Sequence, residues 1–455
     1  MDYSSLPVFA EAEIVVCGGG TAGAYAAKAA ADLGRDVLIV EQTGSLGGSQ
    51  TNGLVTPVSY TGIPSNPRCS YVSREVGERL REIGGCADSY MNFDPELMEI
   101  ILEELCAGAG VRFLYHTFIV GAVTEGGRVT AVAVANKRGL GLVRGGAFID
   151  CTGDADVCVR AGAGYTSGYG NSGKNQSVSL RYTVAGVDFD RFGEQIKEEI
   201  ERSGTDRVAI CRGGKLYLAV TKDGKWTFSD IFDRAIAAGD LDEGDKTYWQ
   251  GFYMPGRPGA VAFNNPEFPC GTDATDPEFA SRIQVEGKRH ILRQLLFYRK
   301  YLRGFGNAYI SKIASVVGVR ESRNVVTDRV LTAEDIFSRR KFPDMFCQTD
   351  YPVDVHGGMP DHPETTCSDG KKWYEIPFGT LVVKGFDNLF VAGRCLGADF
   401  MAQSSVRVQQ SARSSGEAAG IGAALALTRG CTSHGIDGAD VREIMISKGA
   451  EYADR

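Results

Sequence analysis

The sequence predicts an α/β fold in which a Rossmann-like dinucleotide-binding domain is interrupted by an inserted α+β domain. Near the N-terminus a glycine-rich turn joins an apolar strand to an alanine-rich helix, within residues 14–33. Near the C-terminus a second apolar strand precedes a helix of small residues, within residues 388–427. The chain between them carries longer polar strands and amphipathic helices. This change in pattern makes the nucleotide-binding domain discontinuous.

The domain boundaries follow the change in pattern. We expect the nucleotide-binding domain to comprise residues 1–60, 94–175 and 375–455. We expect the inserted domain, which would cover the substrate, to comprise residues 61–93 and 176–374.

The glycine-rich turn has the spacing of a dinucleotide-binding fingerprint. Gly18, Gly20 and Gly23 follow the apolar run 14–17 and precede the helix expected over 24–33. In this motif the first glycine makes a tight turn, the second lets the backbone approach a pyrophosphate, and the third lets the helix pack on the strand. The helix N-terminus offers free N–H groups and a partial positive charge to the phosphates.

The next strand ends in an acidic residue at the position this motif requires. Residues 36–40 are expected to form a second buried parallel strand, and Glu41 follows directly. A carboxylate there accepts hydrogen bonds from the ribose hydroxyls of a dinucleotide. Because a strand, a helix, a second strand and an acidic residue follow in the order the motif requires, the prediction of a dinucleotide-binding site is specific.

Further elements fit the same architecture. A helix is expected over 94–109, with Asp94 as its N-cap. Short strands are expected over 111–115, 118–120, 128–134 and 146–151, separated by glycine turns. In the inserted block the longest helix is expected over 278–302, and in the last part of the chain a helix is expected from Ser404 onward.

Composition sets limits on the function. The chain has 455 residues, 43% of them hydrophobic, and a formal net charge of −8. That charge argues against a nucleic-acid surface, which needs basic residues for the phosphates. No basic leader and no apolar stretch of membrane-spanning length is apparent, and the 12 cysteines show no Cys-x-x-Cys spacing. We therefore expect a cytoplasmic protein that uses no metal and contacts no membrane.

The ordered series of motifs resembles the FAD-dependent oxidoreductases of the glutathione-reductase-like group, including proteins loosely labelled xanthan lyase. The segments that carry the resemblance are Gly18–Gly23 with Glu41 and Gln42, 46–48, 149–156, 318–323, 351–356, 374–378, 388–394 and 404–409. The resemblance covers nearly the whole chain. It implies FAD as cofactor and a redox activity, and it does not name a substrate.

The resemblance also implies where FAD binds. The diphosphate is expected over Gly20–Gly23, the adenosine ribose on Glu41 and the adenine at Ile119, with Gly153 and Asp154 closing around the pyrophosphate side. Gly48, Ser49 and Gln50 are expected beside the ribityl chain and the flavin, and Gly393, Ser405 and Val406 at the ribityl chain and pyrimidine. A helix that starts near Ser405 would direct N–H groups at the flavin. The full set of expected cofactor residues is Gly18, Gly20, Thr21, Ala22, Gly23, Glu41, Gln42, Gly48, Ser49, Gln50, Ile119, Gly153, Asp154, Gly393, Ser405 and Val406.

Fewer residues are candidates for substrate chemistry. His356, one of five histidines, is proposed as the acid–base group. Arg320 and Arg407 are proposed to anchor a substrate carboxylate or the flavin, and Tyr374 to donate to a substrate oxygen. Each has a structural alternative: an Arg–Glu pair between domains, a polar loop residue, or ordinary aromatic packing.

These observations predict an FAD-dependent dehydrogenase or reductase that transfers a hydride between a small organic substrate and the flavin. One alternative is a flavin-dependent monooxygenase or halogenase, because residues 370–377 faintly match a halogenase signature. Lys372 and Tyr374 replace both of its tryptophans. Another alternative is an electron-transfer or RNA-modifying flavoprotein. The oligomeric state is not predicted.

Overall fold

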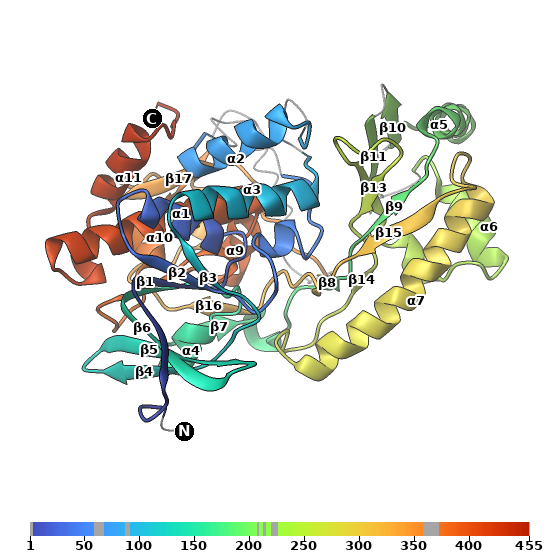
Figure 1. Ribbon diagram of the computed structural model, residues 1–455. Helices are drawn as coiled ribbons and strands as arrows, with labels where there is room; N and C mark the ends of the chain where they lie inside the picture. Colours follow the sequence, from blue (N-terminus) through green and yellow to red (C-terminus); the bar gives the residue numbers. More distant parts are fainter. Residues whose placement is uncertain are drawn as a thin grey trace.

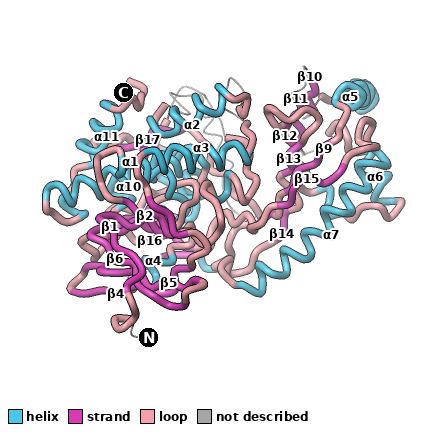
Figure 2. The backbone as a smooth tube through the Cα atoms, viewed as in Figure 1, coloured by secondary structure: helices cyan, strands magenta, loops and turns pink. Residues whose placement is uncertain are grey.

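Two lobes make up the molecule (Figure 1), and the secondary structure of each is shown in Figure 2. The computed structural model describes residues 3–58, 68–86, 92–206, 209–212, 215–219, 226–357 and 373–454. We call the part built on the N-terminal and C-terminal segments the first lobe. We call the part that contains residues 182–313 the second lobe.

A seven-stranded sheet is the centre of the first lobe, in the order β3-β2-β1-β6-β5-β4 with β19 also paired to β6. Its strands are β1 (Val8–Cys17), β2 (Val37–Val40), β3 (Arg112–Leu114), β4 (Phe118–Glu125), β5 (Arg128–Asn136), β6 (Gly139–Asp150) and β19 (Leu389–Val391). β1, β2, β3, β6 and β19 are parallel, whereas β4 and β5 are antiparallel additions. The β1–α1–β2 unit and the parallel return of β19 confirm the predicted α/β fold with a parallel sheet.

Helices and two small ribbons pack around this sheet. The helices are α1 (Gly23–Ala31), α2 (Tyr71–Glu82), α3 (Pro95–Gly108), α4 (Asp156–Ala161), α8 (Ala333–Phe337), α9 (Phe400–Val406), α10 (Gln409–Arg429) and α11 (Gly438–Ser447). The ribbons pair β7 (Tyr165–Ser167) with β16 (Arg323–Val325), and β17 (Met345–Thr349) with β18 (Tyr374–Pro377). α1 and α10 pack against each other at glycines: a Cβ on Gly416 or Gly420 would lie 2.0 or 2.2 Å from a backbone oxygen of α1 or its N-cap.

The second lobe is a six-stranded sheet with helices on one side (Figure 1). Its strands are β9 (Tyr182–Ala185), β10 (Ala209–Arg212), β11 (Lys215–Ala219), β12 (Gln250–Tyr253), β13 (Val261–Phe263) and β15 (Tyr309–Ile313), and its helices are α5 (Phe189–Ser203), α6 (Ser229–Ala237) and α7 (Pro277–Tyr301). Its apolar core includes Trp226, Trp249, Phe228, Phe263 and Tyr298. A short ribbon of β8 (Val178–Ser179) and β14 (Glu267–Phe268) lies between the lobes.

Several boundaries differ from the predicted ones. α2 was expected in the inserted domain, but Tyr71, Val76 and Leu80 belong to the apolar core of the first lobe. The stretch that includes α8 and β17 also packs into that core, so the chain returns to the first lobe well before residue 374. The physical reason is that α2 and α8 bury their apolar faces against α10 and β18, a long-range choice that local pattern does not reveal.

Two helices also differ from expectation. The predicted helix from Ser404 is two helices, α9 and α10, with a break at Arg407 and Val408, where Val408 adopts an extended conformation. α3 begins as predicted, with Asp94 accepting from the backbone N–H groups of Glu96 and Leu97. Among the described residues, no helix is long and apolar enough to cross a membrane.

Candidate active site

A cavity of about 990 Å³ lies between the two lobes. Its wall comes from the glycine turn after β1, the loop after β2, the start of β4, the loop after β6, the segment 316–320, the loop 351–356 and the N-terminus of α10. β11 and β12 of the second lobe complete it. The volume is at the upper end of the range for ligand pockets, and the position between two structural units is typical for them.

Two of the three fingerprint glycines, Gly18 and Gly23, meet steric demands inside the fold, and the third, Gly20, lines the cavity. Gly18 has φ +94°, and a Cβ there would lie 2.6 Å from the carbonyl oxygen of Cys151. A Cβ on Gly23 would lie 1.8 Å from the carbonyl oxygen of Gly18, so this glycine lets α1 pack on β1 and does not line the cavity. Gly20 lines the cavity. Gly48 lies so close to Gly20 that a Cβ on Gly48 would be 2.8 Å from the Gly20 Cα. A side chain is therefore excluded at Gly48, which leaves bare backbone beside Gly20 in the cavity wall.

Glu41 lines the cavity and fixes the turn at the same time. Its Oε2 accepts from the backbone N–H of Gly19 at 2.7 Å, and its Oε1 accepts from the backbone N–H and the hydroxyl of Thr43, each at 2.7 Å. The side chain is buried. Gln42 and Ile119 line the same end of the cavity.

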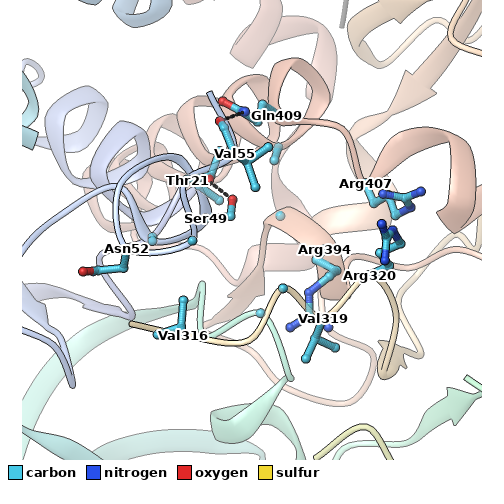
Figure 3. A pocket seen from close by; sticks show the side chains of 18 of the residues that line it. Thr21, Ser49, Asn52, Val55, Val316, Val319, Arg320, Arg394, Arg407 and Gln409 are labelled. Atoms are coloured by element: carbon cyan, nitrogen blue, oxygen red, sulfur yellow. Dashed lines mark hydrogen bonds between the residues drawn. The ribbon is translucent and has the colours of Figure 1, made fainter. Parts of the chain in front are cut away.

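The N-terminus of α1 faces the cavity. No side chain caps it, and the backbone N–H of Ala24 donates to the Gly20 carbonyl oxygen at 3.2 Å. The N–H groups of Gly23 and Tyr25 in the same turn can still serve an anion. Thr21 and Ala22 line the cavity here, and the Thr21 hydroxyl is 2.9 Å from that of Ser49 (Figure 3). Gln50 is next in sequence but does not line the cavity, because it is fully buried and accepts hydrogen bonds from Arg413 of α10.

An ion pair closes another part of the wall. Gly153, Asp154 and Gly393 line the cavity, and Arg394 joins them. Arg394 Nη2 is 2.7 Å from Asp154 Oδ1, and its Nη1 donates to the Ser322 hydroxyl at 2.8 Å. Burial raises the pKa of the Asp154 carboxyl, but the charge of Arg394 outweighs it, so the net shift is downward. The pair stays charged in this partly enclosed position.

Three of the residues expected at the flavin end lie elsewhere. Ser405 and Val406 are buried in α9 and do not line the cavity. Tyr374 is also buried, and its hydroxyl is 2.5 Å from that of Ser405. The helix break moves the cavity-facing helix start to α10, whose N-terminal residues Val408 and Gln409 line the wall. Gln409 donates to the carbonyl oxygens of Val55 and Pro57 at 2.7 and 3.0 Å (Figure 3).

His356 lines the cavity and is held by carboxylates on both ring nitrogens. Nδ1 is 2.7 Å from Oε1 of Glu267, and Nε2 is 3.4 Å from Oδ2 of Asp354. Burial raises the pKa of Asp354, but hydrogen bonding to His356 and the charge of Arg407 outweigh it, so the net shift is downward. Tyr248 packs edge-on against the imidazole, with ring centroids 5.5 Å apart.

Arg320 and Arg407 lie next to each other at this end of the cavity (Figure 3). Arg320 donates to the carbonyl oxygen of Ser177 at 2.7 Å and is 3.1 Å from Glu267. Arg407 is 3.1 Å from Asp354 Oδ2 and donates to the Asp354 carbonyl oxygen at 2.9 Å. The structure thus brings His356, Arg320 and Arg407 together, whereas Tyr374 lies outside the cavity wall.

Several cavity residues carry no strong local signal in the sequence. Arg181 and Tyr248 come from the second lobe and are polar residues in unremarkable contexts. Arg394 ends the motif at residues 388–394, but its contact with Asp154 joins residues 240 positions apart. Only the fold brings these groups to one wall.

Comparison with known proteins identifies the family. The family model described as FAD dependent oxidoreductase matches residues 13–445. The chain belongs to this family. It is therefore an enzyme that uses FAD, as the sequence predicted.

Individual relatives of this FAD-dependent oxidoreductase are distant. Digeranylgeranylglycerophospholipid reductase 2 of Methanopyrus kandleri is 30% identical over 199 residues, which are 40% of this chain and 46% of that protein. The match thus spans less than half of the relative. A geranylgeranyl bacteriochlorophyll reductase-like protein of Thermoplasma acidophilum aligns over 96% of this chain and 84% of its own, with 12% identity and a TM-score of 0.47. The p-nitrophenol 4-monooxygenase of Pseudomonas putida DLL-E4 aligns over 97% of this chain and 87% of its own, with 10% identity and a TM-score of 0.48.

The cavity of this FAD-dependent oxidoreductase has the features that FAD needs. The close approach of Gly20 and Gly48 leaves bare backbone beside the uncapped start of α1, which suits a diphosphate. Glu41 offers a carboxylate at the sequence position of the motif whose acid bonds the ribose of a dinucleotide. The second uncapped helix start, at Val408, lies in the same wall. The residues present therefore fit the cofactor that the family uses.

Proposed function

We propose that this enzyme transfers a hydride between a small organic substrate and FAD, as a dehydrogenase or a reductase. The observation that carries the proposal is a single cavity that runs from the glycine turn and Glu41 to His356, Arg320 and Arg407. When bound, FAD supplies a ring that accepts or gives two electrons. A reductase among the similar sequences supports this class of reaction.

In this proposal the first lobe holds the cofactor. Gly20, Thr21, Ala22 and the start of α1 receive the diphosphate, and Glu41 receives the adenosine ribose. Ile119 would contact the adenine. The rest of the cofactor would be contacted by Gly48, Ser49, Gly153 and Gly393. Arg394 and Gln409 join this set, and the N-terminus of α10 replaces Ser405 and Val406 as the helix end that faces the flavin.

His356 holds or releases the proton that accompanies hydride transfer. The two carboxylates, Glu267 and Asp354, orient the ring. Arg320 and Arg407 hold the substrate or the flavin in place, and both are themselves held by carboxylates. This division of roles is supported by the shared acids: Arg320 contacts Glu267, Arg407 contacts Asp354, and His356 contacts both.

The second lobe forms the substrate side of the cavity in this proposal. We propose that it takes the place of the inserted domain expected from sequence, with boundaries near residues 176 and 320. A small organic molecule is the proposed partner, and the cytoplasm the proposed location.

Anaerobic reduction of the purified protein tests the proposal. We expect the flavin spectrum to bleach with one member of a panel of NADH, NADPH, alcohols, amines and hydroxy acids, or the reduced flavin to be reoxidised by an unsaturated acceptor. His356→Ala should slow that step by about 10²–10⁴-fold, the range of general acid–base catalysis, with the oxidised flavin spectrum retained.

His434→Ala is the matched control, because His434 also pairs with a carboxylate, Asp328 at 2.7 Å, and does not line the cavity. Equal rates in the wild type and His356→Ala would remove His356 from the reaction. Oxygen-dependent hydroxylation or halogenation of a substrate would overturn the proposal in favour of the monooxygenase or halogenase alternative. Residues 370–372, on which part of that alternative rests, lie outside the described residues.

A further inference from the structure

The sheet of the second lobe presents one face to its own core and the other to the cavity. In β11, Leu216 and Leu218 are fully buried in the core, whereas Tyr217 between them lines the cavity. Arg181 directly precedes β9, whose first residue Tyr182 is also in that core. Because successive side chains of a strand point to opposite faces, Arg181 stands on the cavity face, and it lines the cavity.

Among the arginines of the cavity wall, Arg181 differs from the others in its partners. The other arginines of the wall each pair with a carboxylate: Arg160 with Asp156 (2.6 Å), Arg394 with Asp154 (2.7 Å), Arg407 with Asp354 (3.1 Å) and Arg320 with Glu267 (3.1 Å). Within the part of the chain that the structure describes, the Arg181 guanidinium has no ion pair and no hydrogen bond. A guanidinium has five N–H donors, so this group lacks partners for all of them.

We propose that Arg181 binds a carboxylate of the substrate, as a site additional to the residues assigned above. The inference rests on the proposed function, because it places the substrate at the second-lobe wall. A single guanidinium without a carboxylate partner matches one negative charge, which favours a carboxylate monoanion over a phosphate dianion. The planar guanidinium fits a carboxylate with two parallel hydrogen bonds.

The surroundings of Arg181 suit such a ligand. Tyr217, Tyr248 and Phe252 line the same wall and offer aromatic surface to the organic part. Burial lowers the pKa of Arg181 to about 9; Tyr248 opposes this shift, and Arg320 and Arg407 add to it. The group stays protonated at neutral pH, and a bound anion relieves its repulsion with the other two arginines.

Binding of benzoate and of its neutral counterpart benzamide to the FAD-loaded protein, measured by calorimetry, tests the inference without turnover. We expect benzoate to bind at least tenfold more tightly than benzamide. Arg181→Gln should weaken benzoate binding ten- to hundredfold and leave FAD bound, and Arg181→Lys should give an intermediate loss. Arg289→Gln removes an exposed charge from the same lobe, outside the cavity wall, and should have no effect.

Chemical labelling of the wild type avoids any effect of substitution on folding. Phenylglyoxal should modify Arg181 faster than the paired Arg320 and Arg407, and benzoate should protect it, as read by peptide mass spectrometry. The inference fails if benzoate does not bind, if Arg181→Gln binds it like the wild type, or if inorganic phosphate binds more tightly than benzoate. Loss of FAD from Arg181→Gln would assign Arg181 to the cofactor instead. None of these readouts depends on hydride transfer, so failure of the proposed function is seen separately.

Discussion

At the scale of single residues, Glu41 joins cofactor binding to the shape of the glycine turn. Its carboxylate accepts three hydrogen bonds from Gly19 and Thr43 and still lines the cavity. We expect Glu41→Ala to weaken FAD binding by about 1–3 kcal/mol, because a hydrogen bond to a charged group is lost and a backbone N–H of the turn loses its acceptor. Titration of the apoprotein by flavin fluorescence measures this.

Glu13 provides the control for Glu41. It also accepts from a backbone N–H, that of Asp36 at 2.9 Å, but it is partly exposed and lies outside the cavity wall. Glu13→Ala should leave FAD affinity unchanged. Equal FAD affinities of Glu41→Ala and the wild type would remove Glu41 from the cofactor site.

Another residue, Ala155, adopts a backbone conformation that favours glycine. Its φ is +58°. L-residues adopt this left-handed conformation at a cost of about 1–2 kcal/mol. The turn is therefore formed despite the side chain, which is fully buried.

At the scale of elements, a buried carboxylate joins α10 to the start of α2. Glu417 of α10 accepts from the Ser70 hydroxyl at 2.5 Å and from the backbone N–H groups of Tyr71 and Val72. Burial raises its pKa to about 8 despite these bonds. Between the ordinary value near 4.5 and 8, the folded protein holds a proton that the unfolded chain has released.

The free energy of unfolding should therefore fall as pH rises through this window, by up to about 1.4 kcal/mol per pH unit from this group. Glu417→Gln should flatten that part of the profile. Denaturant unfolding at pH 5 to 8 measures it, with Glu78→Gln, an exposed carboxylate of α2, as control. A profile of Glu417→Gln with the wild-type slope contradicts the assignment.

The contact between α1 and α10 depends on glycine. A Cβ on Gly420 would lie 2.2 Å from the carbonyl oxygen of Ala26. Gly420→Ala should lower the free energy of unfolding by about 1–3 kcal/mol, because two backbones must separate. In contrast, Gly108 at the end of α3 has no atom within 4 Å of an added Cβ, so Gly108→Ala should stabilise by up to about 1 kcal/mol. Chemical denaturation distinguishes these two outcomes.

At the scale of the whole molecule, the cavity is the region where both lobes meet, so a bound cofactor links them. FAD at 100 times its dissociation constant should stabilise the folded protein by about 2.7 kcal/mol. Removal of FAD should lower the melting temperature, and its return should restore it. A melting temperature that does not depend on FAD would show that the cofactor does not bind preferentially to the folded state.

The sequence alone determined the local part of this protein. The β1–α1–β2 unit was predicted because it depends on residues close in the chain, and the family was predicted from the ordered series of motifs. The N-cap of α3 and the extent of α7 follow the same rule. These features are set by steric and hydrogen-bonding demands within a few residues.

Only the tertiary structure decided the composition of the cavity wall at its second end. Pattern alone did not reveal the break between α9 and α10, which takes Ser405 and Val406 away from the cavity and places Gln409 there. His356 meets Glu267, and Arg181 pairs with no acid among the described residues, because β9, β14 and the loop 351–356 converge from distant parts of the chain. Such contacts are chosen by the packing of whole elements, for which a single sequence carries no local signal.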